Sequence, residues 1–162
     1  MDHSESAEII CRCYDEMSEV LLETEIEISG MFTCPPDDLD VAVERINKYR
    51  EITDEIAAEI DAVCAEDESG ELKKAVMPQT DRKDVPDDLV SVFEKRQEIN
   101  AIIYRIQNTI PMVQDRLKKS MEKTLEEIKE NNAGQSAKAA RYYSAVTDVQ
   151  NDSSFSRKNR II

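Results

Sequence analysis

The fold of this chain is decided by one stretch, Pro86–Asn131, which reads PDDLVSVFEKRQEINAIIYRIQNTIPMVQDRLKKSMEKTLEEIKEN. Its apolar residues recur at alternating steps of three and four, a spacing that places side chains on one face of an α-helix. This face is formed by Ile99, Ile103, Ile106, Ile110, Val113 and Leu117. At 1.5 Å per residue, a single helix through the stretch has a length of about 65 Å.

Pro111 interrupts the stretch. Proline lacks an amide N–H, and its ring clashes with the preceding turn, which costs roughly 3 kcal/mol inside a helix. The apolar spacing nevertheless passes through Pro111 without a change of phase. We therefore expect one long helix with a kink at Pro111, and the alternative is two helices divided near Thr109.

Two further amphipathic helices precede this stretch. The first is expected from about Ser6 to Ser29, and its apolar face consists of Ile10, Cys13, Met17, Val20 or Leu21, Thr24 and Ile28. The second is expected to start near Pro36, and its face consists of Leu39, Val43, Ile46, Tyr49, Ile52 or Thr53, Ile56, Ile60 and Val63. The link between them is short, which favours an antiparallel pair.

The dipeptide Asp-Asp follows a proline at the start of both the second helix and the long stretch. Proline is tolerated in a first helical turn, and acidic residues there meet the positive end of the helix dipole. Between the two helices, residues 66–85 are expected to form a loop with one helical turn at Glu71–Val76. Ser136–Val149 is expected to form a short helix, and Asn151–Ile162 is polar and basic, as in disordered segments.

The fold class predicted from these patterns is all-α. We expect an antiparallel bundle of three long helices, with a long kinked third helix, a short C-terminal helix and a flexible tail. Residues 1–133 are expected to form the bundle domain, and residues 134–162 the short helix and the mobile basic tail. Because the first helix is shorter than the long one, part of the long helix is expected to project beyond its partners.

Charge excludes several classes of partner. The 162 residues carry a formal net charge of −14, which opposes binding to nucleic acid and to anionic membranes. Residues 1–133 contain 16 Lys and Arg against 33 Asp and Glu, whereas residues 134–162 contain five against two. No apolar run approaches the roughly 20 residues that span a bilayer, and the opening MDHSESAEII is unlike a secretory signal. We expect a cytoplasmic protein that does not insert into membranes.

Motifs that carry catalytic chemistry are missing from the sequence. There is no Gly-rich phosphate loop and no H-E-x-x-H pattern, and the only histidine is His3, which we expect in a frayed terminus. The cysteines, which do not form C-x-x-C pairs, are Cys11, Cys13, Cys34 and Cys64. We therefore expect no metal, no cofactor and no enzymatic activity.

Arg96 is the one cation that falls on the apolar face of the long helix. We expect its aliphatic stem to pack in the bundle while its charged head reaches an acidic side chain or the solvent. The alternative is that Arg96 binds an anionic ligand.

With nucleic-acid binding, membrane insertion and catalysis disfavoured, we expect this protein to function by binding another protein. A projecting helix with an apolar face, together with a tail that carries Tyr142, Tyr143 and Phe155, offers a surface for a partner helix. There are two alternatives. One is that the Ile106–Ile128 face is the core of the bundle. The other is that the aromatic residues dock on the bundle or mediate self-association.

Three passages carry a resemblance to a known family. LDVAVER at 39–45 and LVSVFEKRQ at 89–97 look like an L-x-x-x-hydrophobic-x-x-R pattern that precedes an Ile-rich helix. EIKEN at 127–131, followed by ARYY at 140–143, resembles the end of the family's long helix. SSFSRKN at 153–159 looks like its short Phe-then-basic ending, although an acid is expected in place of Ser156. The family is that of the FlgN/FliT-type flagellar export chaperones.

This resemblance implies a function in protein export. Such chaperones hold late flagellar subunits in the cytosol and deliver them to the type III export gate, and their C-terminal helices meet the cargo. The partners implied are a flagellar hook-associated or filament-cap subunit and components of the export gate, with the chaperone a monomer or weak homodimer. The candidate partner-binding residues are Ile106, Ile110, Val113, Leu117, Tyr142, Tyr143, Val146 and Phe155. The alternative function is a self-associating structural coiled coil or helical adaptor that pairs through the long helix.

Overall fold

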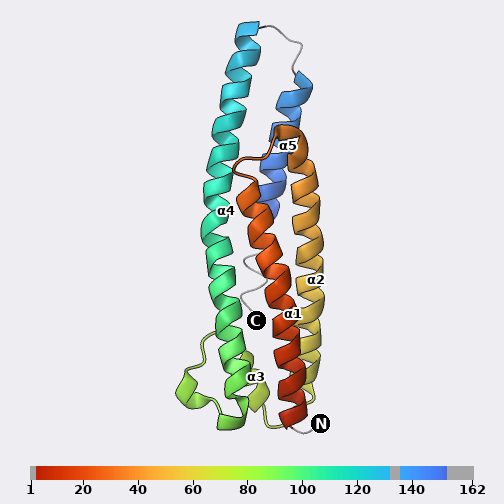
Figure 1. Ribbon diagram of the computed structural model, residues 1–162, viewed down its shortest axis with the longest axis vertical. Helices are drawn as coiled ribbons and strands as arrows, with labels where there is room; N and C mark the ends of the chain where they lie inside the picture. Colours follow the sequence, from red (N-terminus) through yellow and green to blue (C-terminus); the bar gives the residue numbers. More distant parts are fainter. Residues whose placement is uncertain (1–2, 132–135, 153–162) are drawn as a thin grey trace.

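The computed structural model is an elongated bundle of α-helices (Figure 1), and it describes residues 3–131 and 136–152. Three long helices, α1 (His3–Gly30), α2 (Leu39–Ala65) and α4 (Val90–Asn131), run along the long axis, and α1 packs against both α2 and α4. The chain direction reverses from α1 to α2 and again from α2 to α4. The predicted all-α antiparallel bundle is therefore confirmed.

The two Pro-Asp-Asp sequences start helices as expected. Each Asp-Asp lies in a short 3₁₀ turn, η1 (Pro36–Asp38) before α2 and η3 (Asp87–Leu89) before α4. The leucine that follows each pair of aspartates, Leu39 and Leu89, is buried in the core. These turns therefore place the first apolar residue of each helix against its neighbours.

The core consists mainly of aliphatic side chains from the three long helices. At two positions the sequence left open which of two neighbouring residues is buried, and the structure shows which one it is. Leu21 is fully buried and Val20 is only half-buried. Thr53 is fully buried, whereas Ile52 is 41% exposed. The Thr53 hydroxyl donates a hydrogen bond of 2.8 Å to the carbonyl oxygen of Tyr49, so its burial leaves no unpaired donor.

The long helix α4 is continuous through Pro111 and contains 42 residues. Figure 1 shows α4 as one curved rod, so the alternative division near Thr109 is not observed. Ile110 and Val113 are buried on either side of the proline, whose ring lies on the exposed face. The uninterrupted apolar phase correctly predicted that the helix continues.

Residues 66–89 close the end of the bundle that holds the N-terminus (Figure 1). They contain the predicted turn, α3 (Glu71–Val76), and a 3₁₀ turn, η2 (Arg82–Asp84). The Asp67 carboxylate accepts hydrogen bonds from the backbone N–H groups of Ser69 and Leu72 and thereby caps α3. The segment packs on the core through three buried side chains, those of Leu72, Ala75 and Val76.

The C-terminal helix α5 (Ser136–Asp152) contains the predicted 136–149 segment and continues for three more residues. It runs back beside the part of α4 that extends past α1 and α2, and it contacts both α4 and α2. The projecting part of α4 is therefore accompanied by α5. The predicted tail, residues 153–162, lies outside the described residues.

Candidate protein-binding site

Six of the eight candidate partner-binding residues lie together in the core. Ile106, Ile110, Val113 and Leu117 line the inner face of α4, and Tyr142 and Val146 of α5 are buried in the same cluster. Tyr143 points away from that cluster and is 54% exposed. Phe155 lies outside the described residues.

α5 packs against α4 and α2, and its Tyr142 lies beside Leu117. Among the described side chains of α5, the buried ones are Ala139, Tyr142, Ala145 and Val146, at steps of three, three and one. Two of these four are alanines, which allow close approach of the helices. The arrangement is an amphipathic helix laid in an apolar groove, a mode that proteins also use to recognise helical partners. We call the surface of α4 formed by Ile106, Ile110, Val113 and Leu117 the distal groove.

Polar contacts add little to the attachment of α5. The Arg141 guanidinium is 2.5 Å from the Asp37 carboxylate, but both side chains are more than half exposed, and such pairs contribute at most about 1 kcal/mol. Tyr142 also borders a cavity of about 90 Å³ beside Leu39, Leu117 and Ser120. The attachment of α5 thus depends on a short apolar face next to an incompletely filled space.

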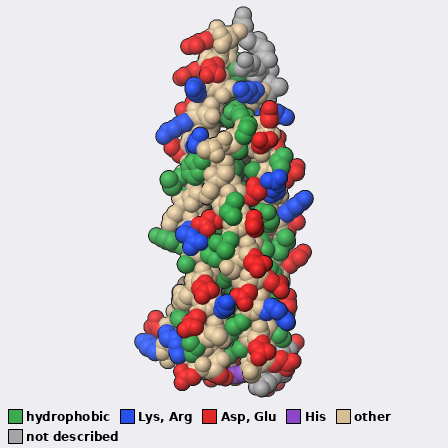
Figure 2. Space-filling model, viewed as in Figure 1, with side chains coloured by type: hydrophobic (Ala, Val, Ile, Leu, Met, Phe, Trp, Pro, Cys, Tyr) green, Lys and Arg blue, Asp and Glu red, His purple; other side chains and the backbone are tan. Residues whose placement is uncertain are grey.

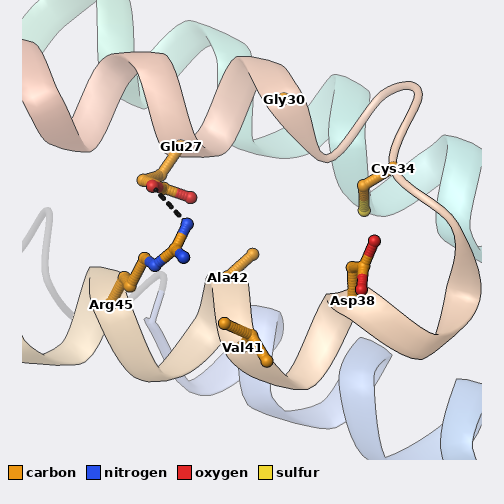
Figure 3. A pocket seen from close by; sticks show the side chains of 7 residues that line it. All are labelled: Glu27, Gly30, Cys34, Asp38, Val41, Ala42 and Arg45. Atoms are coloured by element: carbon orange, nitrogen blue, oxygen red, sulfur yellow. Dashed lines mark hydrogen bonds and ion pairs between the residues drawn. The ribbon is translucent and has the colours of Figure 1, made fainter.

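A second hollow lies between the end of α1 and the start of α2 (Figure 3). It has a volume of about 380 Å³ and is lined by Glu27, Gly30, Cys34, Asp38, Val41, Ala42 and Arg45. Arg45 donates a hydrogen bond of 3.1 Å to Glu27 across it, and Cys34 lies opposite Asp38. Burial and, secondly, the charge of Asp38 raise the pKa of the Cys34 thiol, which keeps it protonated at neutral pH. This hollow therefore offers no activated nucleophile.

Arg96 differs from its expected arrangement. Its side chain is fully buried, and Nη1 donates a hydrogen bond to the backbone carbonyl of Met77 rather than to an acidic side chain. Nε and Nη2 have no hydrogen-bond partner among the described residues, and Phe93 stacks 5.1 Å from the guanidinium carbon. Burial lowers the pKa of Arg96. The expectation that the head reaches an acid or the solvent was wrong, because the 66–89 segment covers it.

A contact that involves His3 was not expected from the sequence. His3 begins α1 instead of fraying, and its Nε2 is 3.2 Å from the Asp67 carboxylate while its Nδ1 is 3.6 Å from Asp88. The hydrogen bond with Asp67, and then the charges of Asp67 and Asp88, raise the pKa of His3. The contact joins the start of α1 to residues 64 and 85 positions away, so no local pattern reveals it. Among the described residues, no group of three or more His, Cys, Asp or Glu side chains is arranged to hold a metal ion.

No match to this chain was found among protein-family models, curated proteins or solved structures. The all-helical architecture agrees with the resemblance to the flagellar export chaperones, but none of these comparisons identifies that family. In the part of the chain that the structure describes, none of the helices is long and apolar enough to span a membrane.

Proposed function

We propose that this protein is a cytosolic export chaperone that binds the helical ends of late flagellar subunits, keeps them soluble and delivers them to the type III export apparatus. The packing of the amphipathic helix α5 against α4, beside Leu117, supports this proposal best. A groove that holds one amphipathic helix through a short apolar face has the shape and chemistry to hold another. The protein is proposed to act by binding alone, without a cofactor.

Binding is proposed to require movement of α5, because α5 packs against α4 beside Leu117, at one end of the distal groove. In this proposal α5 swings aside and the cargo helix packs between it and α4. The cargo then contacts Ile110, Val113 and Leu117 on one side and Tyr142 and Val146 on the other. Tyr143, next to Tyr142 at the edge of that face of α5, then turns toward the cargo. The free energy of opening lowers the apparent affinity, so the free chaperone stays closed and binds its cargo reversibly.

The charge of the chain suits this role. A formal net charge of −14 on a chain of 162 residues favours solubility of the complex while an apolar cargo helix is held. The distal groove itself is aliphatic, so cargo recognition depends on the spacing of apolar residues in the cargo helix.

Tyr143 provides the sharpest test, because it contributes to cargo binding without contributing to the free fold. Its side chain is 54% exposed, so Tyr143→Ser leaves the bundle intact. An aromatic anchor at an interface is commonly worth more than 1.4 kcal/mol, so we expect capture of the cargo to fall at least about tenfold. Tyr104→Ser is the control, since Tyr104 is also exposed, at 66%, but lies on the opposite side of α4 from the distal groove.

The experiment is affinity capture from the native host's lysate with the full chain and each variant, read by mass spectrometry. Recovery of a flagellar hook-associated or filament-cap subunit by the full chain and by Tyr104→Ser, but poorly by Tyr143→Ser, supports the proposal. The captured subunit should also be lost when its own terminal helix is deleted. Recovery of nothing except this chain would contradict the chaperone function and favour the self-associating structural protein.

A further inference from the structure

The outer face of α4, opposite the core, is an uncharged surface on a highly charged molecule. Tyr104 is 66% exposed and Met112 is 62% exposed. Within residues 99–114 the only charged side chain is Arg105, and its guanidinium is held by Glu25 at 2.7 and 3.0 Å. Figure 2 shows hydrophobic side chains along the α4 flank of the molecule, with charged side chains above and below them. We call the exposed residues Ala101, Tyr104, Asn108, Pro111 and Met112 the outer face.

The outer face and the charges beyond it are arranged symmetrically about Asn108. Tyr104 and Met112 lie four residues before and after Asn108, and Glu98 and Lys118 lie ten residues before and after it. In an antiparallel pair of helices related by a two-fold axis at Asn108, each residue faces the one at the equal and opposite distance. Tyr104 then packs on Met112 of the second copy, and Glu98 lies beside Lys118. The two Asn108 amides meet at the axis, where each can donate to the other.

Charge selects this orientation over a parallel one. The end of the outer face near α3 carries the exposed acids Glu94 and Glu98. Residues 115–123 at the distal end carry four exposed bases, Arg116, Lys118, Lys119 and Lys123, and two exposed acids, Asp115 and Glu122, so this end is net positive. A parallel pair places the net positive ends of the two copies together. An antiparallel pair places the net positive end of one copy beside the acidic end of the other, which favours that orientation even though Glu94 then faces Glu122.

Charge also favours this face over the surface of α1 around Ile26. Ile26 of α1 is 63% exposed, but residues 15–30 contain six Asp and Glu and no Lys or Arg. Two copies that met there would repel each other along the whole contact. Of these two surfaces, the outer face of α4 is therefore the one on which charge opposes pairing of two copies less.

We propose that the outer face of α4 binds a second copy of this chain, forming an antiparallel homodimer about a two-fold axis at Asn108. The interface lies on the opposite side of α4 from the distal groove. Each copy therefore keeps its groove and α5 free, with the two grooves at opposite ends of the dimer. Because the contact is a single helix face between two acidic bodies, we expect a weak dimer that dissociates on dilution.

The first test is sedimentation equilibrium of the full chain over a series of concentrations. We expect a monomer–dimer equilibrium that the double variant Tyr104→Ser/Met112→Ser shifts to monomer, with an unchanged circular dichroism spectrum. Ile26→Ser is the matched control, because it removes an equally exposed apolar side chain from α1 and should leave the dimer intact. A wild-type chain that stays monomeric throughout, or a double variant that dimerises as well as the wild type, would overturn the proposal.

The second test fixes the orientation. In a chain with Cys11→Ser and Cys34→Ser, the two half-buried thiols are removed. Asn108→Cys should then form an intermolecular disulfide on mild oxidation, because the two copies of residue 108 meet at the axis. Ala101→Cys should not, because its counterpart lies about 20 Å away along an antiparallel helix. Crosslinking at both positions would indicate a parallel pair, and crosslinking at neither would overturn the proposed interface.

Reversal of charge gives a third readout that does not depend on cysteine chemistry. Glu98→Lys and Lys118→Glu should each weaken the dimer, and the double variant should restore it. If these variants lose the dimer but still capture the flagellar subunit, the proposed chaperone function is supported independently of the dimer. If the chain forms the dimer but captures no flagellar subunit, the dimer is supported and the chaperone function is contradicted.

Discussion

Arg96 sits in a place where a charged side chain is costly. Its guanidinium is fully buried with one hydrogen bond to the Met77 carbonyl, and the hydroxyl of neighbouring Tyr14 is also buried without a partner among the described residues. Burial raises the pKa of Tyr14, so the phenol is neutral and supplies no counter-charge. The guanidinium therefore loses its hydration without gaining an ion pair.

Replacement of Arg96 by methionine, which has a similar length, should stabilise the fold. The change removes an uncompensated buried charge and keeps the packing of its stem, so the free energy of unfolding should rise by roughly 1–4 kcal/mol. Urea unfolding followed by circular dichroism measures it. Arg105→Met is the control, since Arg105 is half-exposed and paired with Glu25, and its loss should cost at most about 1 kcal/mol. If Arg96→Met is destabilising, the buried guanidinium is stabilised by more than its hydrogen bond to Met77 and its contact with Phe93, which would contradict this prediction.

His3 should make stability depend on pH. Its pKa is raised by the hydrogen bond with Asp67 and by the charges of Asp67 and Asp88, and Glu71 lies 3.8 Å from Nδ1. Protonated His3 therefore contributes stability that is fully present below its ordinary pKa of 6.5 and is lost as pH rises through the raised value. Asp67 stays ionised over this range, because hydrogen bonds from Ser69 and Leu72 hold its pKa well below the usual value.

The measurement is the melting temperature of the wild type and of His3→Gln at about pH 5.5 and about pH 8.5. The wild type should exceed the variant at the lower pH, and the difference should shrink at the higher pH. If the melting temperatures of the wild type and the variant differ by the same amount at both pH values, the stability that His3 contributes does not depend on its protonation.

At the scale of elements, the extent of α4 is determined by the regular spacing of its apolar residues and not by the position of Pro111. A helix with this proline lacks one backbone hydrogen bond, yet Ile110 and Val113 remain buried on the same face. The packing of α4 against α1 and α5 therefore outweighs the local cost. The same principle explains why the apolar register, and not the position of proline, predicted the extent of this helix.

Pro111→Ala should stabilise the protein, because the ring is exposed and contributes little packing. Alanine restores the amide N–H and is favoured over proline by up to about 3 kcal/mol in a helix interior. For a protein of this size each kcal/mol raises the melting temperature by roughly 2–4 °C, as calorimetry would show. Asn108→Ala, one turn earlier on the same face, should change stability by less than about 1 kcal/mol. No gain for Pro111→Ala would mean that the backbone around the proline has already compensated.

At the scale of the whole molecule, α5 packs against the distal end of the bundle, and it should be possible to release it without unfolding the rest. Tyr142→Ser with Val146→Ser removes the two large buried side chains among those that the structure describes in α5. We expect amide hydrogen exchange in α5 to become fast while α1, α2 and the first half of α4 stay protected. Tyr143→Ser, on the exposed side of the same helix, should leave the exchange of α5 unchanged. Loss of protection in α1 and α2 as well would show that α5 is an integral part of the core.

The sequence by itself determined the helical elements. The three apolar faces, the Pro-Asp-Asp starts, the turn at Glu71–Val76 and the C-terminal helix follow from residues within a few positions of one another. Such local patterns specify where a helix forms and which side is apolar. They also identified Ile106, Ile110, Val113, Leu117, Tyr142 and Val146 as residues that need an apolar partner, although whether that partner includes a cargo helix remains a prediction.

Only the tertiary structure decided how these faces meet. It buries Thr53 rather than Ile52, covers Arg96 with the 66–89 segment, joins His3 to Asp67, and packs α5 against α4 and α2. Each of these outcomes depends on the relative rotation of elements tens of residues apart, as in the contact between Arg141 and Asp37, which are 104 positions apart. The local pattern of a helix specifies that it has an apolar side, whereas the shape and charge of its neighbours determine what covers that side.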